Sequence, residues 1–137
     1  MKTLRDLVEL KKEKMTDDQI SKIILDCAFK VHTKLGPGLL ESTYRACLAY
    51  ELRKAGLEVE EEKALPLIYD EIKLECGYRI DLLVNSRVIV ELKTVEAFNE
   101  VHTAQVLTYL KLSGCHIGLL INFYTKSLKD GIKRLVL

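Results

Sequence analysis

The 137-residue chain has little of several features that would assign a protein to a specialised class. Its four cysteines (Cys27, Cys47, Cys76 and Cys115) are far apart, form no CxxC pair and do not cluster with histidine, which argues against a zinc site or a dense disulfide framework. No apolar run approaches the roughly 20 residues that cross a bilayer. Residues 1–15 carry charges where a signal peptide has its apolar centre. We therefore expect a cytoplasmic protein with reduced, mostly buried thiols and no membrane partner.

The chain also lacks an excess of charge of either sign. Its formal net charge is +1 at pH 7, so it has no global basic footprint for a nucleic-acid partner, although a local patch is not excluded. What it does have is 48% hydrophobic and 30% charged residues, a composition typical of a globular protein with a hydrophobic core. Because there is no internal repeat, linker or low-complexity segment, we expect one domain.

Helical patterns come first along the chain. Residues 1–15 are charge-dense with a weak apolar stripe and are expected to be a charged N-terminal arm or a peripheral helix, with the single domain spanning residues 16–137. Thr16 and Gln19 have the spacing of a capping box, and apolar residues then recur at helical period until Gly36-Pro37-Gly38 ends the helix. A second helix is expected from about Leu40 to Ala55, before Gly56.

The pattern then becomes β-rich. Between Val59 and Val95 the sequence predicts three antiparallel strands, with turns at Asp70-Glu71 and at Asn85-Ser86-Arg87. A helix is expected from about Asn99 to Gly114, then a central strand over residues 116–123 and a short strand or tail over residues 131–137. The order ααβββαβ(β) favours an α/β or α+β sandwich of one sheet with helices.

The second predicted hairpin carries charges where apolar or neutral residues are usual. Residues two apart in a strand share a face, so Glu91 and Lys93 point the same way. A three-residue turn would pair Val84 with Val88 and set Asp81 opposite Glu91 on that face. The opposite face would be continuously apolar, formed by Ile80, Leu82, Val84, Val88, Val90 and Leu92.

Two carboxylates opposite each other repel unless a positive charge lies between them. A hard divalent cation such as Mg²⁺ binds carboxylate oxygens and keeps several waters, and Lys93 beside it could orient or activate one of them. The hairpin thus predicts a metal-dependent hydrolytic centre. The alternative is structural: Lys93 neutralises Glu91 on an exposed sheet face, since the Glu-x-Lys spacing recurs at Glu9/Lys11, Glu61/Lys63 and Glu71/Lys73.

Polar residues on helical faces add candidates. Glu41 shares a face with Tyr44 and Leu48, so it either contributes to the metal site or is a first-turn acid favoured by the helix dipole. His102, Gln105 and Tyr109 share one face of the later helix. For His102 a structural role is the alternative, whereas a partly buried amide such as Gln105 needs hydrogen-bond partners.

These residues resemble a known family. Asp81 followed by Glu91-Leu92-Lys93, in this order of elements, is similar to the PD-(D/E)XK nuclease superfamily, and Gln105 to Tyr109 resembles the QxxxY motif of its RecB-like branch. The segment Gly38 to Tyr44 (GLLESTY) resembles the signature of the GxxExxY protein family within that superfamily. The likeness covers roughly residues 19–136 and departs in one respect, since Arg79-Ile80 stands where the superfamily name expects proline.

The resemblance implies a restriction-endonuclease-like α/β fold, a mixed sheet flanked by helices, with metal-dependent phosphodiester hydrolysis of nucleic acid, DNA ahead of RNA. It also implies a set of roles, in which Asp81, Glu91, the Leu92 carbonyl and Glu41 hold Mg²⁺ or Mn²⁺. Catalysis would rest on Lys93, Asp81, Glu91 and Gln105, and substrate binding on Tyr109. Apart from the resemblance, Arg79 lies opposite Lys93 in the predicted register and is expected to contact phosphate, and His102 on the helical face of Gln105 is a further substrate-binding candidate. A homodimer is left open. The alternative function is a catalytically silent nucleic-acid- or protein-binding module that keeps the nuclease fold.

Overall fold

A computed structural model describes residues 1–75 and 77–137, with side chains left undescribed at residues 11–13. Its central element is a five-stranded mixed sheet in the order β1-β4-β5-β6-β7. The strands are β1 (Val59–Ala64), β4 (Arg79–Val84), β5 (Val88–Lys93), β6 (Ile117–Asn122) and β7 (Ile132–Val136). Strands β5 and β6 pair in parallel; the other neighbours are antiparallel. The prediction of a mixed sheet flanked by helices is confirmed.

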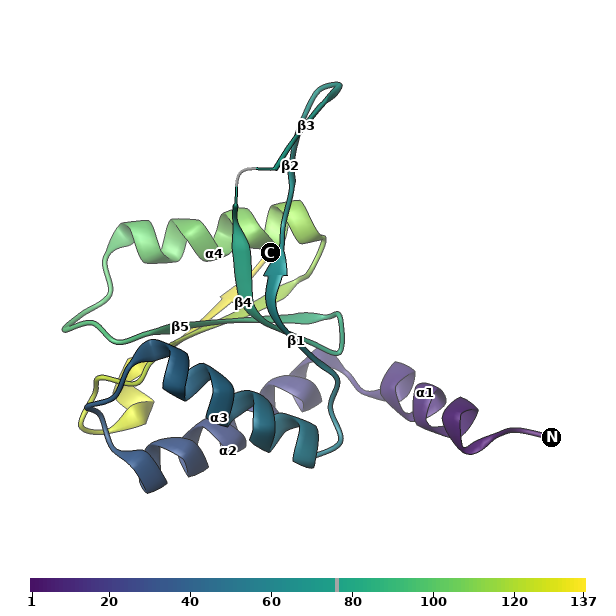
Figure 1. The fold of residues 1–137 in the computed structure, drawn as a ribbon, viewed down its shortest axis with the longest axis horizontal. Coiled ribbons are helices and arrows are strands. Elements are labelled where there is room, and N and C mark those ends of the chain that lie inside the picture. The colour runs from purple at the N-terminus through teal and green to yellow at the C-terminus, as the bar shows by residue number, and fades with distance from the viewer. Residues whose placement is uncertain (76) are drawn as a thin grey trace.

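Two helices cover one face of the sheet and a third covers the other (Figure 1). Helix α2 (Asp17–Leu35) begins with the predicted capping box at Thr16, and α3 (Glu41–Lys54) follows the Gly-Pro-Gly turn. Helix α4 (Glu100–Ser113) makes the crossover between the parallel strands, and it ends at Gly114, which is left-handed at φ 77°. These three helix predictions are confirmed within a residue or two.

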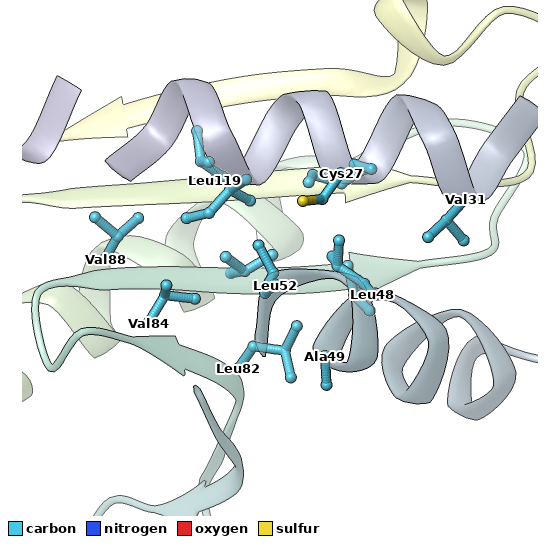
Figure 2. Close-up of a cluster of buried hydrophobic side chains, with 14 of the residues drawn as sticks. Cys27, Val31, Leu48, Ala49, Leu52, Leu82, Val84, Val88 and Leu119 are labelled. Atoms are coloured by element: carbon cyan, nitrogen blue, oxygen red, sulfur yellow. The ribbon is translucent and has the colours of Figure 1, made fainter. Parts of the chain in front are cut away.

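The larger core lies between the sheet and helices α2 and α3. Figure 2 shows Cys27 and Val31 of α2 and Leu48 and Leu52 of α3 directed toward side chains of the sheet such as Leu119. A smaller cluster lies between the other face of the sheet and α4. There Gly118 lets α4 approach closely, because a Cβ at this position would lie 2.6 Å from the Val106 side chain.

The predicted three-stranded meander needs a correction. Strands β1, β4 and β5 form it, but β1 ends at Ala64, and a separate two-stranded hairpin of β2 (Leu67–Tyr69) and β3 (Ile72–Leu74) is inserted before β4. Asp70-Glu71 is therefore the tip of this inserted hairpin and does not join two strands of the main sheet. The physical reason is Pro66, which has no N–H to donate to a ladder and so ends the strand.

The apolar back face also needs a correction at one residue. Leu82, Val84, Val88, Val90 and Leu92 do face α2 and α3, but Ile80 packs in the cluster on the α4 side. Strand β4 is irregular between Ile80 and Leu82, because the opposing Glu62 of β1 has a positive φ of 48° and the backbone N–H of Asp81 bonds a side chain of β5. Strict alternation of faces therefore starts only at Leu82.

The chain ends and the thiols complete the fold. The N-terminal residues, predicted as an arm or a peripheral helix, form helix α1 (Leu4–Lys14), which extends away from the sheet (Figure 1). In the described parts of the chain, Cys27, Cys47 and Cys115 are unpaired, and burial raises the pKa of Cys27; Cys76 lies outside the described residues. Among the helices that the structure describes, none combines the length and apolar character needed to span a membrane.

Candidate active site

The site is built on the turn between β4 and β5. Asn85 and Ser86 both have positive φ, at 51° and 54°, and Arg87 N–H bonds the Val84 carbonyl. Val84 pairs with Val88 and Leu82 with Val90, so the predicted register is confirmed. Continued by one residue, this register brings Asp81 level with Glu91.

At that level the two carboxylates bond backbone groups of the opposite strand. The Asp81 N–H donates to Glu91 Oε1 at 2.9 Å, and the Leu92 N–H donates to Asp81 Oδ2 at 2.8 Å. Each carboxylate thus accepts a backbone N–H from the opposite strand. The two carboxylates are thereby held between the strands, beside each other, with little freedom to turn away.

Burial and repulsion act most strongly on Glu91. Its side chain is in the interior, with the residue only 3% exposed. Burial raises the pKa of Glu91 to about 8, and the neighbouring Asp81 charge adds to the rise, while Lys93 opposes it. Near neutral pH the metal-free site therefore holds a proton on Glu91, shared within the pair.

Glu41 approaches this pair from the start of α3. Burial raises the pKa of Glu41, and the Asp81 charge raises it further, whereas Lys93 and Arg45 lower it. Glu41 is half-buried, and its electrostatic partners include both a carboxylate and the lysine of the hairpin. The structure therefore brings Glu41, Asp81, Glu91 and Lys93 into one region.

Tyr44 fixes the start of α3 beside that region. Its side chain is fully buried and stacks on Phe123, with ring centroids 4.5 Å apart. The Tyr44 hydroxyl donates to the Gly36 carbonyl and accepts from the Leu39 N–H at 3.1 Å. These bonds tie the turn before α3 to the helix itself, and so set where the helix begins at Glu41.

Helix α4 supplies a buried hydroxyl to the same region. Gln105 Nε2 donates to the Tyr109 hydroxyl at 3.1 Å. Burial raises the pKa of Tyr109, the charges on Glu91 and Asp81 add to the rise, and the Gln105 bond lowers it. Gln105 and Tyr109 thus act as one unit beside the carboxylates, and the partner that the Gln105 amide needs is Tyr109.

Two other candidate residues, His102 and Arg79, make hydrogen bonds within the protein. The Asn99 N–H donates to His102 Nδ1 at 3.2 Å, and the His102 N–H donates to Asn99 Oδ1 at 3.1 Å, so His102 completes the capping box of α4. Arg79 is exposed, and its guanidinium donates to the Glu62 carbonyl at 3.3 Å. These contacts favour the structural role for His102 and leave Arg79 at the rim of the sheet.

The sequence patterns did not single out one buried polar residue near the site, Asn122. Asn122, 2% exposed, lies beside Lys93 in the β5–β6 pairing. Its amide donates to the Val95 carbonyl at 2.7 Å, and its carbonyl oxygen accepts from the N–H groups of Val95 (3.2 Å) and Tyr124 (3.1 Å). This side chain holds the backbone that follows Lys93. The available signal was an asparagine at the end of the apolar run over residues 116–123.

A hard divalent cation fits this donor set. Two adjacent carboxylates, one of them protonated by repulsion and burial, are the arrangement that a cation would relieve. Among the side chains that the structure describes, which leave out residues 11–13 and 76, no group of three His, Cys, Asp or Glu lies close enough together to hold a metal ion. The remaining positions would be filled by backbone carbonyls and water, which is how Mg²⁺ is usually bound.

Comparisons with known proteins give one match. Residues 18–135 match the family described as the PD-(D/E)XK nuclease superfamily. No curated protein and no solved structure matches the chain. The match covers the sheet and helices α2 to α4 except for Asp17 and Val136 at their two ends, and it includes every residue of the site described above.

Proposed function

The chain belongs to the PD-(D/E)XK nuclease superfamily, and we propose that it is a Mg²⁺- or Mn²⁺-dependent phosphodiesterase. Members of this superfamily generally use divalent metal ions to cleave nucleic acid, and their fold is restriction-endonuclease-like. We infer DNA as the substrate ahead of RNA. The observation that carries the proposal is the buried Asp81–Glu91 pair, cross-bonded to the backbone and accompanied by Lys93. A surface ion pair has no reason to bury a carboxylate at this cost.

Asp81, Glu91 and the Leu92 carbonyl would hold the cation, with Glu41 contributing from α3. A cation bound there supplies charge to the scissile phosphate and lowers the pKa of a bound water. Lys93 presents its ammonium on the Glu91 side of the strand, where it positions the attacking water and offsets developing negative charge.

The outer residues support this centre. The Gln105–Tyr109 unit orients the carboxylates or contacts the substrate backbone, and Arg79 lies where it could bind a phosphate at the rim. For His102 we retain substrate binding only as a secondary proposal, because its ring nitrogen serves the α4 cap. The GLLESTY segment and the Gln105 to Tyr109 spacing support placing the chain in the GxxExxY family and the RecB-like branch. A cytoplasmic location stays a prediction from the sequence.

A binding module is the second candidate. The near-neutral charge of the chain, and four glutamates in residues 58–62 on and beside the edge strand β1, give no broad basic track for nucleic acid. The complete set of Asp81, Glu91, Lys93 and Gln105 favours the enzyme more strongly, since a lapsed site has no reason to retain costly paired carboxylates.

Lys93 separates the two functions. Linear, nicked and single-stranded DNA and an RNA of the same sequence would be incubated with the protein and Mg²⁺ or Mn²⁺. We expect Lys93→Ala to lower turnover by about 10²-fold or more while substrate and metal binding persist, because a protonated ammonium stabilises the transition state without ligating the metal. Lys93→Arg should not restore turnover, since a planar guanidinium does not replace a compact ammonium.

The matched control is Lys73→Ala, which alters the same Glu-x-Lys spacing in the exposed β3 and should leave turnover unchanged. Metal binding is followed separately through the melting temperature, which Mn²⁺ should raise in wild type and in Lys93→Ala but not in Asp81→Asn. A wild type that binds nucleic acid with metal, yet cleaves none of the substrates above the level of Lys93→Ala, would establish the binding module instead.

A further inference from the structure

Arg45 lies on α3 one turn after Glu41, on the side of the helix that meets strand β1. Residues four apart on a helix are neighbours on its surface, and the Arg45 charge lowers the pKa of Glu41. The side chain of Arg45 is only 21% exposed. A guanidinium is therefore held mostly out of water, beside one of the acids assigned to the cation.

The protein satisfies this guanidinium poorly. Arg45 forms an ion pair with Glu62, but its Nη2 lies 3.7 Å from Glu62 Oε1, which is too far for a hydrogen bond. The Nε of Arg45 is buried and has no hydrogen-bond partner in the part of the chain that the structure describes. A buried polar atom without a partner is rare in a folded protein and calls for a water, an ion or a ligand. Arg45 thus keeps hydrogen-bonding capacity for a further group.

A second arginine of the same helix shows what a structural tie to β1 looks like. Arg53 Nη1 donates to Glu61 Oε2 at 3.1 Å, and its Nη2 donates to the Val59 carbonyl at 2.9 Å. These two bonds join α3 to β1 directly. Among the described residues Arg45 makes no comparable bond, so the attachment of the helix to the strand does not depend on it.

Glu62 lies at an irregular point of β1. The β1–β4 pairs on either side of Glu62 place it level with Asp81, and its φ of 48° is in the left-handed region, as is common where a strand bulges beside a functional site. The Arg79 guanidinium donates to the Glu62 carbonyl at 3.3 Å. Arg45 and Arg79 therefore meet at Glu62, one beside its carboxylate and the other on its carbonyl.

The charge at this point is positive once the neighbouring acids are counted. Glu62 is the one acid that faces both guanidiniums, and its side chain is 56% exposed, so it can turn into water. With a divalent cation bound, the three carboxylates of the metal site are balanced by the cation and Lys93. The other acids nearby are in ion pairs of their own, at 3.1 to 3.6 Å: Glu60 with Lys63, Glu61 with Arg53 and Glu75 with Lys73.

We propose that Arg45, together with Arg79, binds a phosphate of the nucleic-acid strand beside the one at the metal, and that Glu62 occupies this place in the free protein. The proposal rests on nucleic acid being the substrate, as proposed above. An exposed ion pair contributes little to stability, whereas a guanidinium binds phosphate through charge-assisted, bidentate hydrogen bonds. The phosphate therefore displaces Glu62, and Arg45 is a substrate-binding residue.

The test is the binding of a labelled DNA oligonucleotide, single-stranded and as a duplex, measured by fluorescence anisotropy with Mn²⁺ in the Lys93→Ala background. Arg45→Gln should raise the dissociation constant by about tenfold or more, because a charge-assisted contact is lost. It should also reduce the dependence of the logarithm of the binding constant on the logarithm of salt concentration by about 0.7–0.9, the share of one phosphate. Arg53→Gln removes the same charge from the same helix and should change neither quantity.

Glu62→Gln should have the opposite sign. It should lower the dissociation constant by about two- to fivefold, because the phosphate no longer displaces a carboxylate from Arg45. Glu61→Gln is the matched control, since it removes an equal charge from the same strand, and it should leave the dissociation constant unchanged. If Arg45 were only structural, Arg45→Gln and Glu62→Gln would lower the melting temperature alike, and neither would alter the salt dependence.

These outcomes separate the phosphate contact from the nuclease activity. Binding and salt dependence unchanged by Arg45→Gln, or altered equally by Arg53→Gln, would overturn the contact even where Lys93→Ala abolishes cleavage. A wild type that cleaves nothing, yet binds DNA with a salt dependence that Arg45→Gln reduces, would refute the nuclease and support the contact. A chain that binds no oligonucleotide would overturn both. Circular dichroism of each variant verifies that the domain is folded.

Discussion

At the scale of single residues, Glu91 is the side chain whose burial most strongly opposes its charged form, the form that a metal ion would bind. Its carboxyl group is inside the protein, beside a second acid, and its Oε1 accepts the Asp81 N–H. Burial of a charged carboxylate is costly unless it is paired or coordinates a metal. The metal-free protein avoids this cost by keeping the proton, whereas a cation would stabilise the charged form. Protonation and metal binding therefore compete at this site.

The first prediction is a pH dependence of stability in the presence of a chelator. The pKa of Glu91 rises from its ordinary value of 4.5 to about 8 in the folded protein, so the folded state binds a proton that the unfolded state has released. The free energy of unfolding should consequently fall as pH rises from about 4.5 to about 8, and Glu41, whose pKa is also raised, should add to the fall at the lower end.

Denaturant titrations across this pH range would measure the effect. Glu91→Gln should flatten the slope, since the amide carries no proton to lose, and saturating Mn²⁺ should restore stability on the alkaline side. The control is Asp26→Asn, an exposed carboxylate on α2 in an ion pair with Lys22, which should leave the slope as in wild type. A slope of equal size in Glu91→Gln would mean that Glu91 does not hold the proton.

At the scale of the elements, the site depends on how α3 and the end of β5 are held. The turn before α3 has no side-chain cap at Leu40, and Tyr44 supplies the missing constraint from within the helix by bonding Gly36 and Leu39. On the other side, the Asn122 amide bonds both backbone groups of Val95. Two buried polar side chains thus determine where Glu41 and Lys93 lie.

Tyr44→Phe tests the first of these constraints. The change keeps the ring that stacks on Phe123 but leaves the Gly36 carbonyl and the Leu39 N–H without their partner, so the free energy of unfolding should fall by about 1–3 kcal/mol. Chemical denaturation measures it. Tyr50→Phe is the control on the same helix, because Tyr50 is 62% exposed and its change should be close to neutral. If the two changes lowered the free energy of unfolding equally, the Tyr44 hydroxyl would not be what stabilises the turn before α3.

Asn122→Ala tests the second constraint. The Val95 and Tyr124 N–H groups would lose their acceptor, so both amides should exchange with deuterium faster than in wild type, by tenfold or more if about 1.4 kcal/mol of protection is lost. The Phe123 N–H provides an internal control, because it bonds the Lys93 carbonyl at 2.9 Å and should stay protected. Unchanged exchange at Val95 would show that Asn122 does not hold this segment.

At the scale of the whole molecule, the folded unit and its projecting parts are distinct. Helix α1 is exposed along its length, apart from the partly buried Leu10, as far as its side chains are described. The chain joins the core at Met15, which packs against the larger cluster and whose carbonyl accepts a bond from Arg87. The domain predicted to begin at residue 16 should therefore fold without α1.

Removal of residues 1–13 tests this boundary. Because Met15, the Thr16 cap and the Arg87–Asp17 ion pair of 2.7 Å all remain, the free energy of unfolding should change by less than about 0.5 kcal/mol, as for other changes remote from the core. Thermal and denaturant unfolding of the shortened and complete chains would be compared. A loss of several kcal/mol would make α1 an integral part of the domain.

The sequence by itself determined the features that depend on neighbouring residues. The capping box at Thr16, the helix start near Asn99, the stop at Gly114 and the three-residue turn before Val88 follow from local hydrogen bonding and backbone preference. Alternation along β5 placed Glu91 and Lys93 on one face, and the turn length brought Asp81 level with Glu91. The fold class followed from the order of such elements.

Only the tertiary structure decided what depends on groups distant in the chain. The burial that raises the pKa of Glu91, the approach of Glu41 and the bonds of Asn122 to Val95 all require elements that meet across the sheet. The displaced Ile80 escaped prediction for the same reason, because the local geometry of strand pairing depends on contacts that no local pattern contains. The strand break before the inserted hairpin, in contrast, had a local signal at Pro66. Local preferences specify the elements, whereas packing specifies which side chains lose their water and therefore which become reactive.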